Sequence, residues 1–62
     1  MKIELVENPN CPQDVLEVLA RDNNYLIRAL VAGNPRTPIN VLLVLKKDKN
    51  AYVRYWAGYT LR

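Results

Sequence analysis

The sequence predicts an all-α protein, a short α–α superhelix (solenoid) of two helical repeats preceded by an N-terminal half-repeat. The first observation is repetition, because residues 8–36 lie over residues 34–62 at an offset of 26. Each copy also opens with Asn-Pro-x-x-Pro, and apolar residues at helical spacing follow each opening. A unit that stacks on its copy needs to repeat its turn and apolar positions in this way. The coincident residues are Asn8/Asn34, Pro9/Pro35, Pro12/Pro38, Val15/Val41, Leu16/Leu42, Val18/Val44, Leu19/Leu45, Asp22/Asp48, Asn24/Asn50, Arg28/Arg54 and Arg36/Arg62.

Each unit begins with prolines and continues into a first helix. The prolines of NPNCP and NPRTP fix φ and lack a backbone donor, so no helix runs through them. The segments QDVLEVLARD and INVLLVLKKD follow, and Pro12 and Pro38 are suited to the first helical turn. We therefore expect a helix after each proline pair, the second of them over residues 38–47.

A second helix follows in each unit after a short polar link. Asp22 and Asp48 head the links DNN and DKN, and their side chains are suited to cap the next helix. The helical segments are YLIRALVAG and AYVRYWAGYTLR. Gly33 stands where a helix ends in a left-handed residue, directly before the next Asn-Pro. Helices this short need packing against neighbours to be stable.

The whole chain, residues 1–62, is expected to be one module. Repeat 1 spans residues 8–33, and repeat 2 spans residues 34–62 with a C-terminal cap. Residues 1–7 extend the alignment backward and are interpreted as the remnant of a preceding second helix. A β-strand is the alternative for this segment, because KIELVE alternates in polarity.

Composition argues against several classes of function. Apolar residues make up 50% of the chain and charged residues 24%, as in ordered globular proteins. No stretch approaches the ~20 apolar residues of a membrane span, and no long apolar signal region opens the chain. We therefore expect a soluble, cytoplasmic protein with no membrane partner.

Catalytic and metal chemistry are not expected either. Cys11 is the single cysteine and the chain has no His, so an internal disulfide is excluded and a metal site within one chain is not expected. Without His, Ser or a Gly-rich phosphate loop, the usual acid–base and nucleophile arrangements cannot be assembled. The sequence predicts no enzyme, no catalytic residue, no cofactor and no small-molecule substrate.

Three motifs of the second unit point to a family. The segment NPRTPINVLLVLKKDKNAYVRYWAG contains Asn-Pro-x-Thr-Pro, then Leu-x-x-Leu, then Asp-x-x-x-x-Val-Arg, while the first unit has Cys11 and Ile27 in place of Thr and Val. This pattern resembles the leucine-rich repeat variant family, a relative of HEAT-type helical repeats. The resemblance implies a right-handed superhelix of α-helices alternating with shorter, partly 3-10 helices, and a surface used for binding. The chain departs from the family in having two units and a fragment, and in ending on YTLR where another Asn-Pro turn is expected.

Charge is unevenly distributed along the chain. Residues 1–17 carry one base and four acids, a net −3, and residues 18–62 carry eight bases and two acids, a net +6, which together give +3. This asymmetry is compatible with an anionic partner, with head-to-tail contact between copies, or with an ordinary solvated surface. Bases also recur at fixed positions in the unit, so one hypothesis is electrostatic nucleic-acid binding by the basic C-terminal part. The possible contacts are Arg21, Arg36, Lys46, Lys47, Lys49 and Arg62.

Other repeated residues indicate a structural role. Asp22 and Asp48 are each expected to pair with the arginine six residues on, Arg28 or Arg54, because a packed guanidinium needs a carboxylate. Trp56 takes an apolar position of the first unit and is expected to plug the open end of the solenoid, with direct ligand contact as the alternative.

The differences between the copies predict a binding surface. Gln13 and Glu17 of the first unit become Ile39 and Leu43, an i, i+4 pair on a face that the first unit gives to solvent. The last helix gains aromatic residues that either complete the plug or act as interface anchors, namely Tyr52, Tyr55 and Tyr59. The leading hypothesis is therefore an interaction module that binds a protein partner or another copy of itself through Ile39, Leu43 and these tyrosines.

Overall fold

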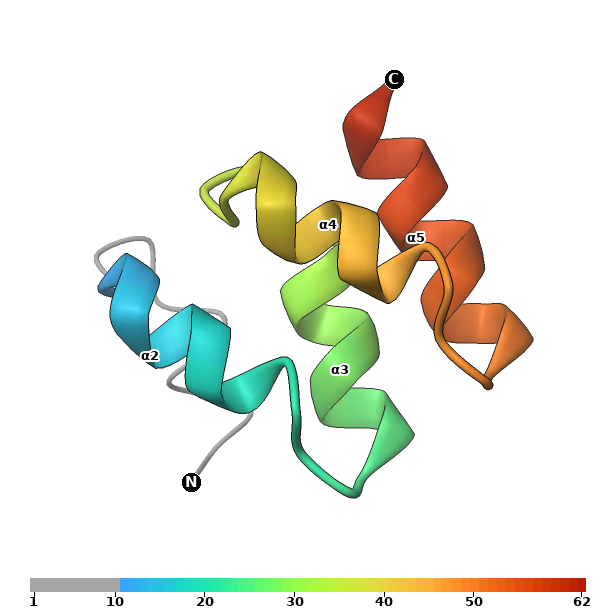
Figure 1. Cartoon of the computed structure of the whole chain (residues 1–62), viewed down its shortest axis with the longest axis horizontal. Helices are drawn as coiled ribbons and strands as arrows, with labels where there is room; N and C mark the ends of the chain where they lie inside the picture. The colour runs from blue at the N-terminus through green and yellow to red at the C-terminus, as the bar shows by residue number, and fades with distance from the viewer. Residues whose placement is uncertain (1–10) are drawn as a thin grey trace.

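A computed structural model describes residues 11–62, and all the regular structure in this range is α-helical (Figure 1). The prediction of an all-α protein is therefore confirmed for this part of the chain. The interpretations of residues 1–7, and of the first Asn-Pro turn at Asn8 and Pro9, lie outside the described residues. The helices are α2 (Gln13–Leu19), α3 (Tyr25–Ala32), α4 (Ile39–Leu45) and α5 (Ala51–Leu61).

The helices pack as two pairs that share a central contact. The most extensive contact joins α3 to α5, while α4 packs on α5 and α2 packs on α3. Figure 1 shows α2 and α5 on opposite sides of α3. Since α3 and α5 are equivalent in the sequence repeat, helices that correspond in sequence lie side by side in space.

The first helix of each unit starts just after its proline. Pro12 (φ −62°, ψ 148°) and Pro38 (φ −57°, ψ 146°) are extended and precede the first helical residue. The expectation that they lie within the first turn was therefore off by one position. The fixed φ of proline suits either position, the first helical residue or the residue before it. The extended ψ of Pro12 and Pro38 places them before the helix.

The second helix of each unit is capped by asparagine, and the expectation that the aspartates cap it was wrong. The side chain of Asn24 accepts one amide of α3 at 2.9 Å, and that of Asn50 accepts two amides of α5 at 2.8 and 3.3 Å. Asp22 and Asp48 act one step earlier, because their carboxylates accept the N–H of Asn24 and Asn50, each at 2.9 Å. Each aspartate thus shapes the turn that positions the cap.

Gly33 ends α3 without adopting a left-handed conformation, contrary to expectation. Its φ of −85° and ψ of −5° are right-handed, and its N–H donates to the carbonyl of Ala29 at 2.9 Å. The helix stops because Pro35 follows and cannot continue it. Gly33 lies close to α5, since a Cβ built on it would lie 3.4 Å from Cε3 of Trp56.

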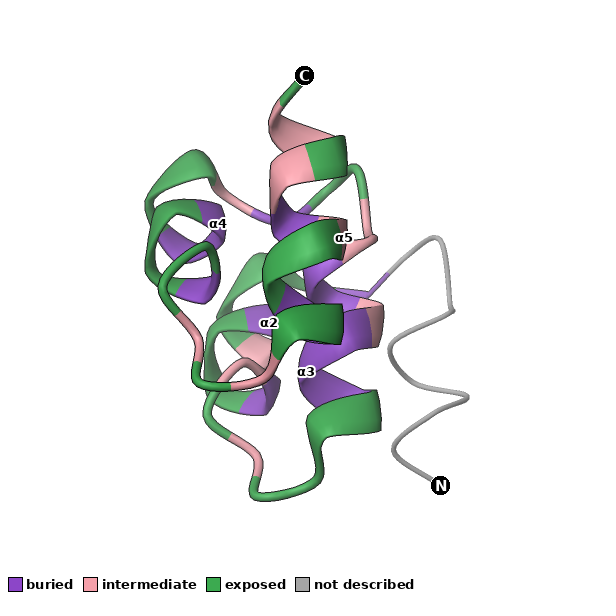
Figure 2. Cartoon of the chain, turned by 90° about the vertical axis from the view of Figure 1, so that its right-hand side faces the viewer, coloured by how far each residue is buried: buried purple, intermediate pink, exposed green. Residues whose placement is uncertain are grey.

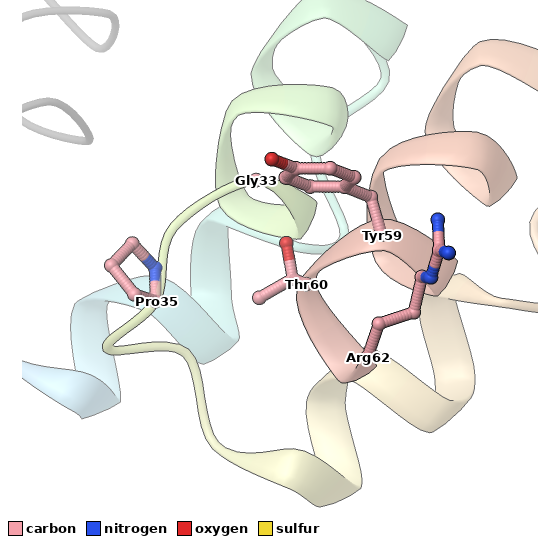
Figure 3. Close-up of a pocket in the computed structure, with 5 residues that line it drawn as sticks. All are labelled: Gly33, Pro35, Tyr59, Thr60 and Arg62. Carbon is pink, nitrogen blue, oxygen red and sulfur yellow. The ribbon is translucent and has the colours of Figure 1, made fainter.

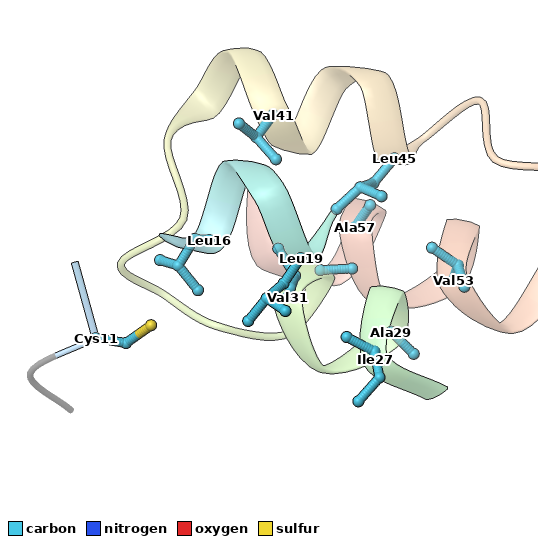
Figure 4. Close-up of a cluster of buried hydrophobic side chains, with 11 residues drawn as sticks. Cys11, Leu16, Leu19, Ile27, Ala29, Val31, Val41, Leu45, Val53 and Ala57 are labelled. Carbon is cyan, nitrogen blue, oxygen red and sulfur yellow. The ribbon is translucent and has the colours of Figure 1, made fainter. Parts of the chain in front are cut away.

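The hydrophobic core is built mainly from the facing sides of the four helices (Figure 4). Two repeated apolar positions are not part of it, because Val18 and Val44 are 72% and 69% exposed. The buried cluster consists of Cys11, Leu16, Leu19, Ile27, Ala29, Val31, Ala32, Val41, Leu45, Val53 and Ala57.

Two threonine hydroxyls tie the end of α3 to other segments. The buried hydroxyl of Thr37, in the Asn-Pro-x-Thr-Pro turn, donates to the carbonyl of Val31 at 2.7 Å. The hydroxyl of Thr60 in α5 donates to the carbonyl of Ala32. Carbonyls at the last turn of a helix lack an intrahelical partner, so these bonds satisfy α3 while joining it to the second unit.

Candidate functional site

A buried ion pair joins the two units. The guanidinium of Arg28 on α3 meets the carboxylate of Asp48 through two bonds, Nε to Oδ1 at 2.9 Å and Nη2 to Oδ2 at 3.3 Å. The two side chains are 8% and 12% exposed. Each arginine was expected to pair with the aspartate of its own unit, whereas the carboxylate that binds Arg28 belongs to the next unit. Packing of α3 against α5 brings the turn before α5 beside α3, and the local sequence does not show this.

Within each unit, the arginine contacts the aspartate six residues earlier through the main chain. Nη1 of Arg28 donates to the carbonyl oxygen of Asp22 at 2.6 Å, and Nη1 of Arg54 donates to that of Asp48 at 2.7 Å. The guanidinium is thereby held against the turn that precedes its helix. Arg28 and Arg54 share this anchor, but Arg28 is buried and Arg54 is exposed.

Asp48 is ionised in the folded protein. Burial raises the pKa of its carboxyl, but hydrogen bonds from the Asn50 amide and the Arg28 guanidinium outweigh burial, and the pKa lies below its ordinary 3.8. The nearby charges of Arg28 and Lys49 lower the pKa further. Asp48 therefore has a structural role, because both of its carboxylate oxygens are engaged within the protein.

An aromatic cluster covers one side of α5. Trp56 is half-buried against the core, and the rings of Tyr52, Tyr55 and Tyr59 meet it edge to face at centroid distances of 6.3, 5.6 and 5.7 Å. Tyr25 of α3 meets Tyr52 in the same way at 6.5 Å. All four tyrosines are exposed, with Tyr55 at 63%. Edge-to-face contacts hold the rings in place while leaving their outer surfaces open to a partner.

The predicted apolar pair lies on the outside of α4. Ile39 is 68% exposed and Leu43 is 52% exposed. At the equivalent positions of α2, Gln13 and Glu17 are also exposed. Figure 2 shows how the buried residues line the inner side of each helix and leave the outer side exposed. The two aliphatic side chains therefore occupy a surface that the first unit gives to polar residues.

Two exposed residues near these surfaces were not among the predicted site residues. Val44 lies beside Leu43 on α4, and we name Ile39, Leu43 and Val44 the α4 strip. Tyr25 starts α3 and extends the aromatic cluster through its contact with Tyr52. The equivalent of Val44 in the first unit is Val18. Because both are apolar and stand at helical spacing, the sequence did not indicate that Val44 is exposed. The equivalent of Tyr25 in the second unit is Ala51, and this difference between the copies could have identified Tyr25 as a surface residue.

All six basic residues proposed for nucleic-acid contact are exposed. Three of them cluster in the segment between α4 and α5, where Asp48 is the acid among them and is engaged by Arg28. Arg21 and Arg36 lie in the turns after α2 and α3, and Arg62 follows α5. The clustered bases are Lys46, Lys47 and Lys49.

A shallow hollow lies between the ends of α3 and α5 (Figure 3). Figure 3 shows Tyr59 and Arg62 on the side of α5 and Pro35 on the opposite side, with Gly33 and Thr60 completing the lining. The Thr60 hydroxyl is used for the bond to Ala32, so it is not available for recognition. The hollow is a continuation of the aromatic cluster through Tyr59.

Residues 11–62 contain no group of three or more His, Cys, Asp or Glu side chains that is arranged to hold a metal ion. Over the same residues, no helix has the length and apolar character that crossing a membrane requires. The Cys11 thiol is buried, and it donates to the carbonyl oxygen of Pro12 at 3.7 Å.

Comparisons of the chain with protein-family models, with curated proteins and with solved structures found no match.

Proposed function

We propose that this chain is a non-catalytic interaction module, a two-unit helical-repeat solenoid of the leucine-rich repeat variant kind, that binds a protein through the α4 strip and the tyrosines of α5. The observation that supports the proposal is the exposure of Ile39 and Leu43 at positions where the first unit carries exposed polar residues. Large apolar side chains grouped on a surface are a feature of interaction sites.

The aromatic cluster supplies the second part of the proposed surface. Tyrosine is enriched at interfaces because its ring gives a large contact area at low entropic cost and its hydroxyl tolerates water. Tyr55 and Tyr59 project from α5 with their rings already held against Trp56. A partner therefore meets side chains that need little further ordering.

The test replaces Ile39 and Leu43 with their first-unit equivalents, Ile39→Gln and Leu43→Glu, in one variant. The full chain is immobilised, and proteins captured from a lysate of the source cells are compared between wild type and variant after nuclease treatment. We expect the variant to keep its helical circular dichroism spectrum, because both side chains are exposed, and to lose a defined protein that wild type retains.

The matched control is Val18→Gln, which removes an equally exposed apolar side chain from α2. This control should capture the same protein as wild type. Unfolding of the double variant would place Ile39 and Leu43 in the core and contradict the proposed surface. Equal capture by wild type and double variant would contradict it as well.

Electrostatic nucleic-acid binding is the second candidate. It is supported by the exposure of Lys46, Lys47 and Lys49 and by the engagement of Asp48, the acid among them in the sequence, by Arg28. Binding of this kind weakens steeply as salt rises, because phosphate contacts release counterions. Reversal of the three lysines to Glu should abolish retention of a fluorescent DNA or RNA oligonucleotide. Salt-independent retention would contradict this candidate.

A further inference from the structure

Two neighbouring residues of α3 are buried, whereas the residues at the equivalent positions of α5 are exposed. On α3, Arg28 and Ala29 are buried, and the packing of α5 against α3 covers this side of the helix. Their equivalents on α5 are Arg54 and Tyr55, and both are exposed. We name Arg54, Tyr55 and Gly58 the open face of α5.

Arg54 is held in the same way as Arg28, but no carboxylate of residues 11–62 pairs with it. Both arginines donate from Nη1 to a main-chain carbonyl six residues earlier. Arg28 also donates hydrogen bonds from Nε and Nη2 to the carboxylate of Asp48. Within residues 11–62, no acceptor meets these two nitrogens of Arg54. The guanidinium is thus anchored by one nitrogen and presents the edge that suits bidentate carboxylate recognition.

The chain itself offers carboxylates at its other side. Asp14 and Glu17 are exposed on α2, and the nearest base along the described chain is Arg21, in the turn that follows the helix. The open face of α5 belongs to the strongly basic second unit, in which Lys49 and Arg62 are also exposed. Figure 1 shows that α2 and α5 lie on opposite sides of the molecule, so both surfaces can be engaged at once.

We propose that the open face of α5 binds the acidic outer face of α2 in a second copy of this chain, so that copies associate head to tail. The inference rests on the proposed function as an interaction module and adds a second binding surface, whose partner is another copy of this chain. Contact between two α5 faces would bring like charges together, whereas contact between α5 and α2 pairs opposite charges. A head-to-tail contact is heterologous and allows further copies to add at either end.

Sedimentation equilibrium of the full chain at low ionic strength tests the inference. Wild type should show an average mass that rises above the monomer mass with concentration and falls back when salt is added. Arg54→Glu alone, or Asp14→Lys with Glu17→Lys, should each lower the association constant about tenfold or more. A mixture of these two variants should associate again, because each retains the surface that the other has lost.

Lys46→Glu is the charge-matched control and should associate as wild type does, because this exposed residue follows α4 and belongs to neither of the two proposed surfaces. Circular dichroism checks that every variant is folded. If Arg54→Glu does not fold, Arg54→Gln replaces it, and the variant of Asp14 and Glu17 tests the opposite surface independently.

Several results would overturn the head-to-tail inference. These are a wild-type protein that stays monomeric at every concentration, association that survives both sets of charge reversals, and a mixture of variants that remains monomeric. None of these results affects the proposed function, because capture of a different protein through Ile39 and Leu43 is measured separately. Equal capture by wild type and the Ile39 and Leu43 variant, with head-to-tail association intact, would instead remove the α4 strip from the proposed function.

Discussion

At the scale of single residues, the Arg28–Asp48 pair carries the strongest prediction. Asp48→Asn keeps the shape of the side chain but leaves the guanidinium of Arg28 buried without a negative partner. We expect a loss of about 2 kcal/mol in the free energy of unfolding, measured by urea denaturation at neutral pH. Since small domains have stabilities of only a few kcal/mol, this change should lower the unfolding midpoint substantially.

The effect of Asp48→Asn should depend on pH in one direction. The folded-state pKa of Asp48 is lowered, so its stabilising contribution is fully present above the ordinary 3.8 and is lost as pH falls through the lowered value. The difference between wild type and variant should therefore shrink in acid. Glu17→Gln, which alters an exposed carboxylate on α2, is the control and should change stability by less than about 0.5 kcal/mol at neutral pH. A difference that grows in acid would contradict the assigned role.

At the scale of helices, the glycines of α3 and α5 lie in different surroundings, one at a helix end and one inside a helix. Gly33 ends α3 in a right-handed conformation, and a Cβ there would meet Trp56 and the carbonyl of Ala29 at 3.4 and 3.5 Å, which are ordinary contact distances. Gly33→Ala should therefore stabilise the protein by about 0.5 kcal/mol, because alanine restricts the unfolded chain. Thermal unfolding measures the shift, and a large destabilisation would show that Gly33 needs a conformation open only to glycine.

Gly58→Ala is the internal comparison for Gly33→Ala. Gly58 lies inside α5, and a Cβ there would meet nothing within 4 Å. The substitution should stabilise the protein by about 1 kcal/mol through helix propensity alone.

At the scale of the whole molecule, the two units should unfold together. The α3–α5 contact, the Arg28–Asp48 pair and the Thr60–Ala32 bond all cross between them. Trp56 lies at the junction beside Gly33, so its fluorescence reports on the interface, while circular dichroism reports on all helices. The two signals should give coincident thermal transitions. A fluorescence transition well below the helical one would mean that the units separate before they unfold.

Much of the candidate surface was visible in the sequence because it depends on differences between equivalent positions. Ile39 and Leu43 replace polar residues, and the structure places both on the outside of α4. Their role in binding stays a prediction. Val44 was not recognised, because a repeated valine at helical spacing does not reveal which way it faces. Arg54 was assigned to the aspartate of its own unit, because pairing between units depends on how they pack.

By itself, the sequence determined that residues 11–62 fold into helices separated by the proline turns and the polar links. Prolines fix φ and remove donors, polar links start new helices, and apolar spacing follows the helical period, so these choices depend on residues a few positions apart. Only the tertiary structure decided that Arg28 binds Asp48, that Val18 and Val44 face solvent, and that Gly33 stays right-handed. These outcomes depend on the packing of segments that are distant in the chain, and local interactions do not specify that packing.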